Sequence, residues 1–143
     1  MLKQLKMEDQ GPIIEGAQWV RLSRHEDDRG LLTVLDDGSL PFSPVRFFTI
    51  SAGPGAVRGE HASSSHELIA CLSGTVVVDL NNGATTATVT LDDGSWGLWV
   101  KPGVWLRLHS FGPGTILGVA ANLRYVETQH WPMANFTSAR GTI

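Results

Sequence analysis

The residues best suited to chemistry gather in one short stretch, GAVRGEHASSSHELIACLSG, which spans positions 55 to 74. It contains one arginine, two histidines and one glutamate, namely Arg58, His61, His66 and Glu67. An imidazole takes up or releases a proton near neutral pH, and a guanidinium holds a phosphate or an enolate through its planar fork. The stretch therefore predicts a site for proton transfer, with an arginine available to bind an anion.

The spacing within this stretch resembles the first motif of the cupins, small β-barrels whose motif places two histidines two residues apart. Residues i and i+2 of a strand point the same way, so such a pair can hold a metal inside the barrel together with a glutamate. Here Ser63 stands at the second histidine position, and Leu106 stands where a second cupin motif would add another histidine. We therefore predict no catalytic metal. The alternative is a metal site rebuilt from His61, His66 and Glu67.

A wider resemblance runs from about residue 26 to about residue 128. The segments DDRGLLTVLDDGSLPFSPVRFFTI, RGEHASSSHELIACLSGTVVVDLNNG, GLWVKPGVWLRLHSF and YVET are similar to the sugar-nucleotide 3,4-ketoisomerases of the WxcM-like family. These are cupins that act on dTDP-4-keto-6-deoxyglucose without a metal. The resemblance implies a double-stranded β-helix (a jelly-roll barrel), a nucleotide-sugar or other small carbonyl substrate, no cofactor, and a homodimer with exchanged strands.

The same resemblance implies roles for four residues. Moving a keto group from C4 to C3 of a sugar removes a proton from the carbon beside a carbonyl and returns one to the neighbouring atom. This needs a base poised near neutral pH and a donor for the enediol oxygen. We expect His61 to be the base, Arg58 to bind the phosphate or the enolate oxygen, and Ser63, Glu67 or a water to relay protons.

The chain departs from the family pattern at Ser63, Leu106, Phe48 and Thr49, where the family places histidines or tyrosines. These departures leave four alternatives open. The protein is then an isomerase or cyclase acting on a non-sugar intermediate of natural-product biosynthesis, a 3,5-epimerase-like enzyme with one histidine base, a ligand-binding cupin without catalysis, or a metal-dependent oxygenase.

Other residues are candidates for contacts with the substrate. Arg46, on an apolar strand, predicts a buried anion or a carboxylate partner, and Trp105 either stacks on a nucleotide base or fills the core. Alternation along VWLRLH turns Leu106 inward and His109 outward, which favours a structural role for His109. The predicted substrate-binding residues are Arg46, Arg29, Leu106, Phe48, Tyr125, Trp105 and His109. Near the edges of the chain, His25 and His130 are predicted to lie on the surface.

Composition narrows the class of protein. The chain has 143 residues, 42% of them hydrophobic and 17% charged, which is typical of one folded domain spanning 1–143. Its net charge of -3 and the absence of a basic patch argue against a nucleic-acid partner. The sequence begins with MLKQLKMEDQG, which contains no long apolar segment, so we predict neither a signal peptide nor a membrane span. The single cysteine, Cys71, excludes an internal disulfide framework and fits a cytoplasmic protein.

Short apolar runs separated by glycine, proline, aspartate and asparagine predict an all-β sandwich or barrel. The turn residues include DDRG, NNG, KPG and GPG. The predicted strands are 19–23, 31–35, 45–51, 67–74, 75–80, 84–91, 96–100, 104–111, 115–121 and 123–129. The weakly patterned tail, 132–143, leaves three possibilities: a short helix, an arm against a neighbouring subunit, or a disordered end.

Overall fold

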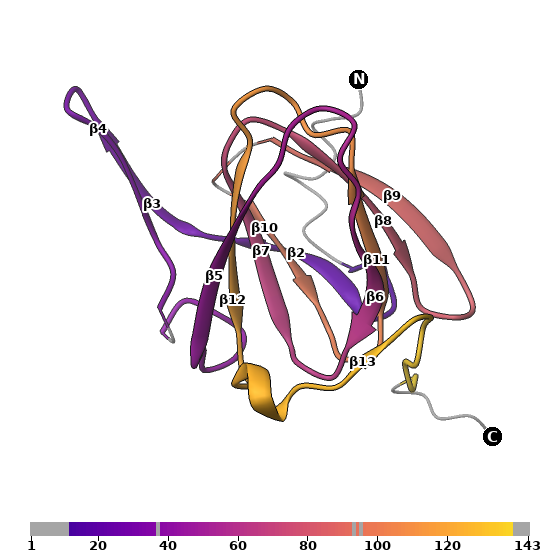
Figure 1. Ribbon diagram of the computed structural model, residues 1–143. Helices are drawn as coiled ribbons and strands as arrows, with labels where there is room; N and C mark the ends of the chain where they lie inside the picture. The colour runs from indigo at the N-terminus through magenta and orange to yellow at the C-terminus, as the bar shows by residue number, and fades with distance from the viewer. Residues whose placement is uncertain (1–11, 37, 93, 95, 139–143) are drawn as a thin grey trace.

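The protein consists of two antiparallel sheets that face each other, with a hairpin projecting from one side (Figure 1). The computed structural model describes residues 12–36, 38–92, 94 and 96–138. The larger sheet has the order β1 (Pro12–Ile14), β2 (Ala17–Arg21), β10 (Trp96–Val100), β7 (Glu67–Ser73), β12 (Ile116–Ala121) and β5 (Arg46–Ser51). The smaller sheet has the order β13 (His130–Trp131), β6 (Arg58–Ser63), β11 (Trp105–His109), β8 (Val76–Asn81) and β9 (Thr86–Leu91).

Alternation along the strands builds the core between the sheets. On β8, Val76, Val78 and Leu80 are buried, while the residues between them are half-buried. Leu106 and Leu108 do the same on β11. Aliphatic side chains at every second position of a strand share one face, so the two apolar faces pack together. One end of this core is not filled by side chains, and the candidate site described below lies there.

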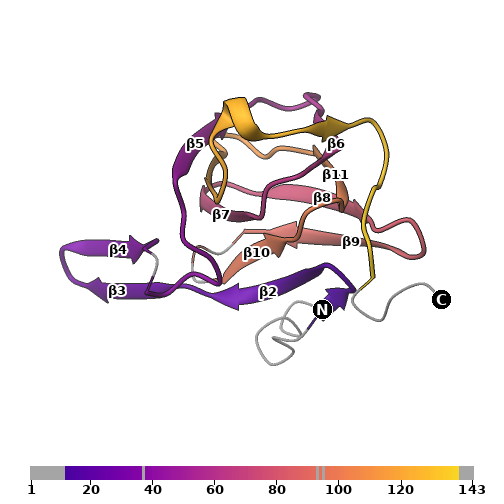
Figure 2. The ribbon, with the colours of Figure 1, turned by 90° about the horizontal axis from the view of Figure 1, so that it is seen from below.

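The hairpin of β3 (Ser23–Asp27) and β4 (Gly30–Val34) projects away from the barrel and pairs with neither of the two larger sheets (Figures 1 and 2). Leu31 and Leu32 on β4 are about half exposed. A two-stranded ribbon with exposed leucines buries little apolar area of its own. This feature bears on the assembly proposed below.

The all-β prediction is confirmed, with differences at particular segments. The predicted strand 123–129 is wrong, because Tyr125–Glu127 forms a single turn of 3₁₀ helix in which the N–H of Thr128 donates to the carbonyl of Tyr125. Four strands lie outside the predicted ranges or only touch them, namely Pro12–Ile14, Ser23–Asp27, Arg58–Ser63 and His130–Trp131. In the first three segments charged, glycine or proline residues interrupt the apolar alternation on which the prediction depends, and His130–Trp131 is too short to show any alternation.

The described part of the tail, 132–138, packs on its own barrel and forms no helix. The N–H of Asn135 donates to the carbonyl of Gly103 at 2.7 Å, and Phe136 packs against the core between the sheets. The hydroxyl of Ser138 contacts the carboxylate of Glu15. Residues 139–143 lie outside the described part. No helix among the described residues is long and apolar enough to cross a membrane.

Candidate active site

A cavity of about 510 Å³ lies between the two sheets. Small-molecule sites commonly measure roughly 300 to 1,000 Å³, so this cavity suits a compact ligand. Its polar and titratable lining consists of Arg46, Thr49, Arg58, His61, Glu67, Tyr125 and His130. Most of its apolar lining comes from Phe48, Ile69, Leu106, Leu108 and Val119.

A one-residue bulge in β6 turns both Arg58 and His61 into this cavity. Two consecutive residues of β11 pair with Gly59 and His61, so Glu60 is the extra residue between them. Gly59 and Glu60 have φ angles of 83° and 62°, the left-handed backbone that such a bulge requires. Residues three positions apart on a regular strand face opposite sides, so the bulge is the reason that both side chains share the cavity.

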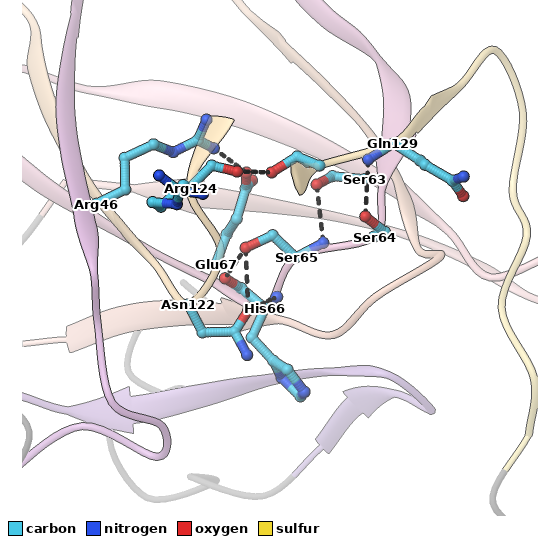
Figure 3. Close-up of polar contacts among 10 residues, drawn as sticks. Arg46, Ser63, Ser64, Ser65, His66, Glu67, Asn122, Arg124 and Gln129 are labelled. Carbon is cyan, nitrogen blue, oxygen red and sulfur yellow. Dashed lines mark hydrogen bonds and ion pairs between the residues drawn. The ribbon is translucent and has the colours of Figure 1, made fainter. Parts of the chain in front are cut away.

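Arg46 and Glu67 form a mostly buried ion pair at the wall of the cavity (Figure 3). Nη2 of Arg46 lies 3.7 Å from Oε2 of Glu67, and the guanidinium also lies over the rings of Phe48 and Tyr125. The prediction that Arg46 has a carboxylate partner is confirmed. Burial raises the pKa of Glu67 to about 7, and the positive charge of Arg46 offsets this only in part. The carboxyl group is therefore able to hold or release a proton near neutral pH.

His61 occupies a wall position with a second histidine beside it. The rings of His61 and His130 meet edge to face, with centroids 4.9 Å apart and an interplanar angle of 73°. Burial, and then the charge of His130, lowers the pKa of His61 below its ordinary value. Nδ1 of His61 is buried and has no hydrogen-bond partner among the described residues. His61 is thus kept in its neutral, basic form.

The three consecutive serines hold the connection between β6 and β7 against the chain that follows β12 (Figure 3). The hydroxyl of Ser63 accepts the N–H of Ser65, and the hydroxyl of Ser65 donates to Oδ1 of Asn122. The hydroxyl of Ser64 accepts the N–H of Gln129 at 2.8 Å, while the N–H of Ser64 donates to the carbonyl of Gln129. These bonds fix the segment that carries Tyr125 and His130 over the cavity.

A family model described as "FdtA: WxcM-like, C-terminal" matches residues 15–138. The chain belongs to this WxcM-like family. It is 35% identical over 107 residues to the TDP-4-oxo-6-deoxy-α-D-glucose 3,4-oxoisomerase of Aneurinibacillus thermoaerophilus, covering 73% of this chain and 77% of the relative.

Two solved structures of the 3,4-ketoisomerase QdtA from Thermoanaerobacterium thermosaccharolyticum resemble the whole barrel. A double mutant in complex with TDP gives a TM-score of 0.79 at 28% identity, over 84% of this chain and 89% of that one. A mutant in complex with TDP-4-keto-6-deoxyglucose gives a TM-score of 0.75 at 26% identity, over 79% and 84%. The prediction of a single cupin-like β-domain is thereby confirmed for this WxcM-like protein.

The structure of this WxcM-like protein brings together seven of the residues chosen from its sequence. They are Arg46, Phe48, Arg58, His61, Glu67, Leu106 and Tyr125. Alternation at the start of β7 turns the adjacent residues His66 and Glu67 to opposite sides of the sheet, and Glu67 is the one that faces the cavity. His66 lies outside the barrel, where its Nδ1 accepts the indole N–H of Trp99. A metal site made of His61, His66 and Glu67 is therefore not assembled.

Four other predicted residues do not line the cavity. Trp105 donates its indole N–H to the carbonyl of Pro132 on the outer face of β11, and His109 on the same face lies 3.0 Å from the carboxylate of Asp79. Arg29 lies on the projecting hairpin, paired with Asp27, and the hydroxyl of Ser63 is engaged in the turn after β6. Within the described ranges, no group of three or more histidine, cysteine, aspartate or glutamate residues is placed to hold a metal ion.

His130 is the titratable cavity residue that sequence reasoning missed. The prediction placed it on the surface, and its side chain is indeed partly exposed, but it also lines the cavity beside His61. It lies on a strand of two residues after a 3₁₀ turn, too short to show apolar alternation. The serine run was a usable signal, because consecutive hydroxyls commonly bind the backbone of a neighbouring segment.

Proposed function

We propose that this protein is a sugar-nucleotide 3,4-ketoisomerase that acts on a TDP-4-keto-6-deoxy sugar (TDP is also written dTDP), with His61 as the base. The observation that carries the proposal is the placement of His61. It is a neutral imidazole on the wall of a cavity that also holds two arginines and a carboxyl group with a pKa of about 7. A base near its working pH and cations for a developing oxyanion are what proton removal beside a carbonyl requires.

The proposed reaction conserves every proton. His61 removes the proton on C3, the C3–H electrons form the C3–C4 double bond, and the C4 carbonyl oxygen takes up a proton to give the enediol. The hydroxyl on C3 then loses its proton and becomes the carbonyl, and C4 receives a proton. Arg46 and Arg58 are the cavity's cations, and their charge stabilises the enolate oxygen and the substrate's diphosphate.

Arg58 is the better placed of the two arginines to bind diphosphate. Arg46 already pairs with Glu67, whereas Arg58 is exposed and makes no ion pair within the described part of the chain. A guanidinium with free donors at the mouth of a cavity binds phosphate oxygens in a bidentate manner. Leu106 and Phe48 give the inner end of the cavity an apolar surface that suits the methyl group of a 6-deoxy sugar.

The family membership and the named relatives favour this reaction over the other candidates. Relatives at 26% to 35% identity carry the names of 3,4-ketoisomerases, and one of them is seen with TDP-4-keto-6-deoxyglucose. The 3,5-epimerase-like reading, the non-sugar isomerase of natural-product biosynthesis and the non-catalytic binding module remain as outcomes of the test described below. A cytoplasmic location is part of the proposal, since Cys71 is buried and unpaired, as expected in a reducing compartment.

A homodimer is a further part of the proposal. Phe47 on β5, Leu72 on β7 and Ile116 on β12 are exposed on the outer face of the larger sheet, and Leu31 and Leu32 are exposed on the hairpin. Contiguous apolar side chains on a surface favour burial against another copy. Sedimentation analysis should give a dimer for the wild type and a monomer, or a much weaker dimer, for Leu72→Glu. A monomeric wild type would contradict this part.

The test offers TDP-4-keto-6-deoxyglucose in D₂O to the wild type, His61→Asn and His66→Asn, and follows the sugar protons by NMR. We expect deuterium incorporation and a 3-keto product with the wild type and His66→Asn, and loss of both with His61→Asn. His66→Asn is the matched control, because His66 lies outside the barrel. Exchange without a 3-keto product would replace the proposal by the epimerase-like reading. A folded wild type that catalyses no exchange would overturn it.

A further inference from the structure

We propose that His130 is the second acid–base residue of this site, replacing the histidine that the chain lacks at position 63. This rests on the ketoisomerase function proposed above. The reaction moves protons at two carbons and at two oxygens, and a single imidazole cannot face all four atoms at once. The cavity therefore needs a second group that carries protons, and the geometry points to His130.

The strand pairing puts His130 where a histidine at position 63 would have to be. Strand β13 pairs antiparallel with β6, and His130 is the direct partner of Ser63. Side chains of directly opposed residues lie on the same side of a sheet, with their Cβ atoms about 4.5 to 5.5 Å apart. From this position beside Ser63, the imidazole of His130 reaches the ring of His61, with the ring centroids 4.9 Å apart.

The serine run determines this placement. Ser64 makes two hydrogen bonds with the backbone of Gln129, the residue directly before His130 (Figure 3). Together with the pairing of β13, they hold the His130 backbone in register with β6. The stretch that lost one histidine thus provides the hydroxyl and backbone groups that bring another histidine to the same place.

The two histidines divide the proton transfers between carbon and oxygen. Neutral His61 takes the proton from C3, while protonated His130 gives a proton to the oxygen on C4. His130, now neutral, takes the proton from the hydroxyl on C3, and the His61 imidazolium returns its proton to C4. Both residues end in their starting forms, and no proton or electron is left over. Opposite roles suit the pair, because burial, and then the positive charge of His130, lowers the pKa of His61 and favours its basic form.

Other titratable groups face His61 and His130, and the experiment must distinguish their contributions to proton transfer from those of the two histidines. They are Arg46, Arg58, Glu67 and Tyr125. Tyr125 is the nearest competitor for the acid, since its ring lies 5.9 Å from that of His130. Tyr125→Phe removes its hydroxyl and keeps the ring beside Arg46 and His130, so it tests whether that hydroxyl is the acid.

The experiment compares His130→Phe, His130→Ala, Tyr125→Phe and the double variant His130→Ala with Ser63→His. Phenylalanine keeps an aromatic edge beside His61 but carries no proton. We expect His130→Phe to lower kcat roughly 100-fold or more, the usual contribution of a general acid or base, with KM within a few-fold of the wild type. Adding Ser63→His to His130→Ala returns an imidazole to the site, and the double variant should be at least tenfold more active than His130→Ala alone.

A second readout does not depend on turnover. NMR titration of the imidazole protons should show the His61 pKa rising in His130→Phe, because the neighbouring charge is gone. If the wild type and His130→Phe are both fully active, the proposed role of His130 is overturned. The proposed ketoisomerase function would still stand. Loss of activity in Tyr125→Phe equal to that in His130→Phe, without rescue by Ser63→His, would assign the acid to Tyr125 instead. A folded but inactive wild type would overturn the proposed function itself.

Discussion

Arg58 and His61 face the same cavity although three positions separate them on one strand. The extra residue Glu60 reverses the alternation between them, and Gly59 supplies the backbone conformation that makes this possible. The bulge therefore decides which side chains the site contains. A regular strand with the same sequence order would turn one of the two away from the substrate.

Replacing Gly59 by alanine should damage both the fold and the site. A Cβ at Gly59 would lie 2.9 Å from Cδ1 of Leu106, and the φ of 83° disfavours any side chain. We expect a loss of roughly 2 to 4 kcal/mol in the free energy of unfolding, measured by urea denaturation. Gly55→Ala is the control, since Gly55 has a φ of 87° but open space around it, and should cost only about 1 kcal/mol. Equal losses would mean that the contact with Leu106 is unimportant.

The buried carboxyl of Glu67 should make the protein less stable as the pH rises. Its pKa in the fold, about 7, is above the ordinary value of 4.5, so folding favours the protonated form. This contribution is complete below pH 4.5 and is lost as the pH rises through about 7, by at most about 3 kcal/mol. The stability of Glu67→Gln relative to the wild type should therefore increase between pH 5 and pH 8 in urea titrations. A difference that stays constant with pH would contradict the buried environment.

The acidic limb of the pH–rate profile should report His61. Because the pKa of His61 is lowered from 6.5, the limb of kcat/KM should have its midpoint below pH 6.5. The groups that face His61 across the cavity are Arg46, Arg58, Glu67, Tyr125 and His130. The same limb should persist in Glu67→Gln, which separates it from the carboxyl that titrates nearby. A midpoint at or above 6.5 in both proteins would rule out His61 as the base.

The hydroxyl of Ser64 should order the segment that covers the cavity. Ser64→Ala removes the acceptor for the N–H of Gln129 and leaves the backbone bond in place. Hydrogen exchange of the amide of Gln129 should become faster, and kcat should fall more than the affinity for TDP. Ser73→Ala is the control, because its hydroxyl bonds to the carbonyl of Gly114 at an exposed site outside the cavity lining. Equal effects of the two substitutions would show that Ser64 has no special role.

Arg58 should provide much of the affinity for the diphosphate. A hydrogen bond to a charged group contributes about 1.5 to 3 kcal/mol, so Arg58→Ala should weaken TDP binding roughly 10- to 100-fold. Isothermal titration calorimetry with TDP measures this directly. Arg107→Ala is the control, since Arg107 pairs with Asp79 on the outer face of β11. Unchanged affinity in Arg58→Ala would move the phosphate site elsewhere.

Strand alternation and turns marked by glycine, proline and aspartate were sufficient to predict an all-β sandwich or barrel, and the family resemblance narrowed this to a cupin barrel. Alternation allows only one of the adjacent residues His66 and Glu67 to face inward, and the spacing of the cupin-like motif favours Glu67, which lines the cavity. His109 was correctly expected to face outward, although it was also among the predicted substrate contacts. These predictions depend on residues within one strand.

Contacts between distant segments were the part that could not be predicted. The bulge at Glu60 has no apolar pattern that would reveal it, and Tyr125–Glu127 lies within a predicted strand but forms a 3₁₀ turn. The approach of His130 to His61 depends on a two-residue pairing between chain segments almost seventy residues apart. No local pattern in the sequence records such a pairing, because it is decided by how the barrel closes.

The direct opposition of Ser63 and His130 also has an evolutionary consequence. The two positions are direct neighbours on the same side of the sheet, so a large ring at one of them limits the side chain that fits at the other. Among relatives, positions 63 and 130 should then vary together rather than independently. A search for the two-histidine motif alone would pass over members of the family that keep their second imidazole on the opposite strand.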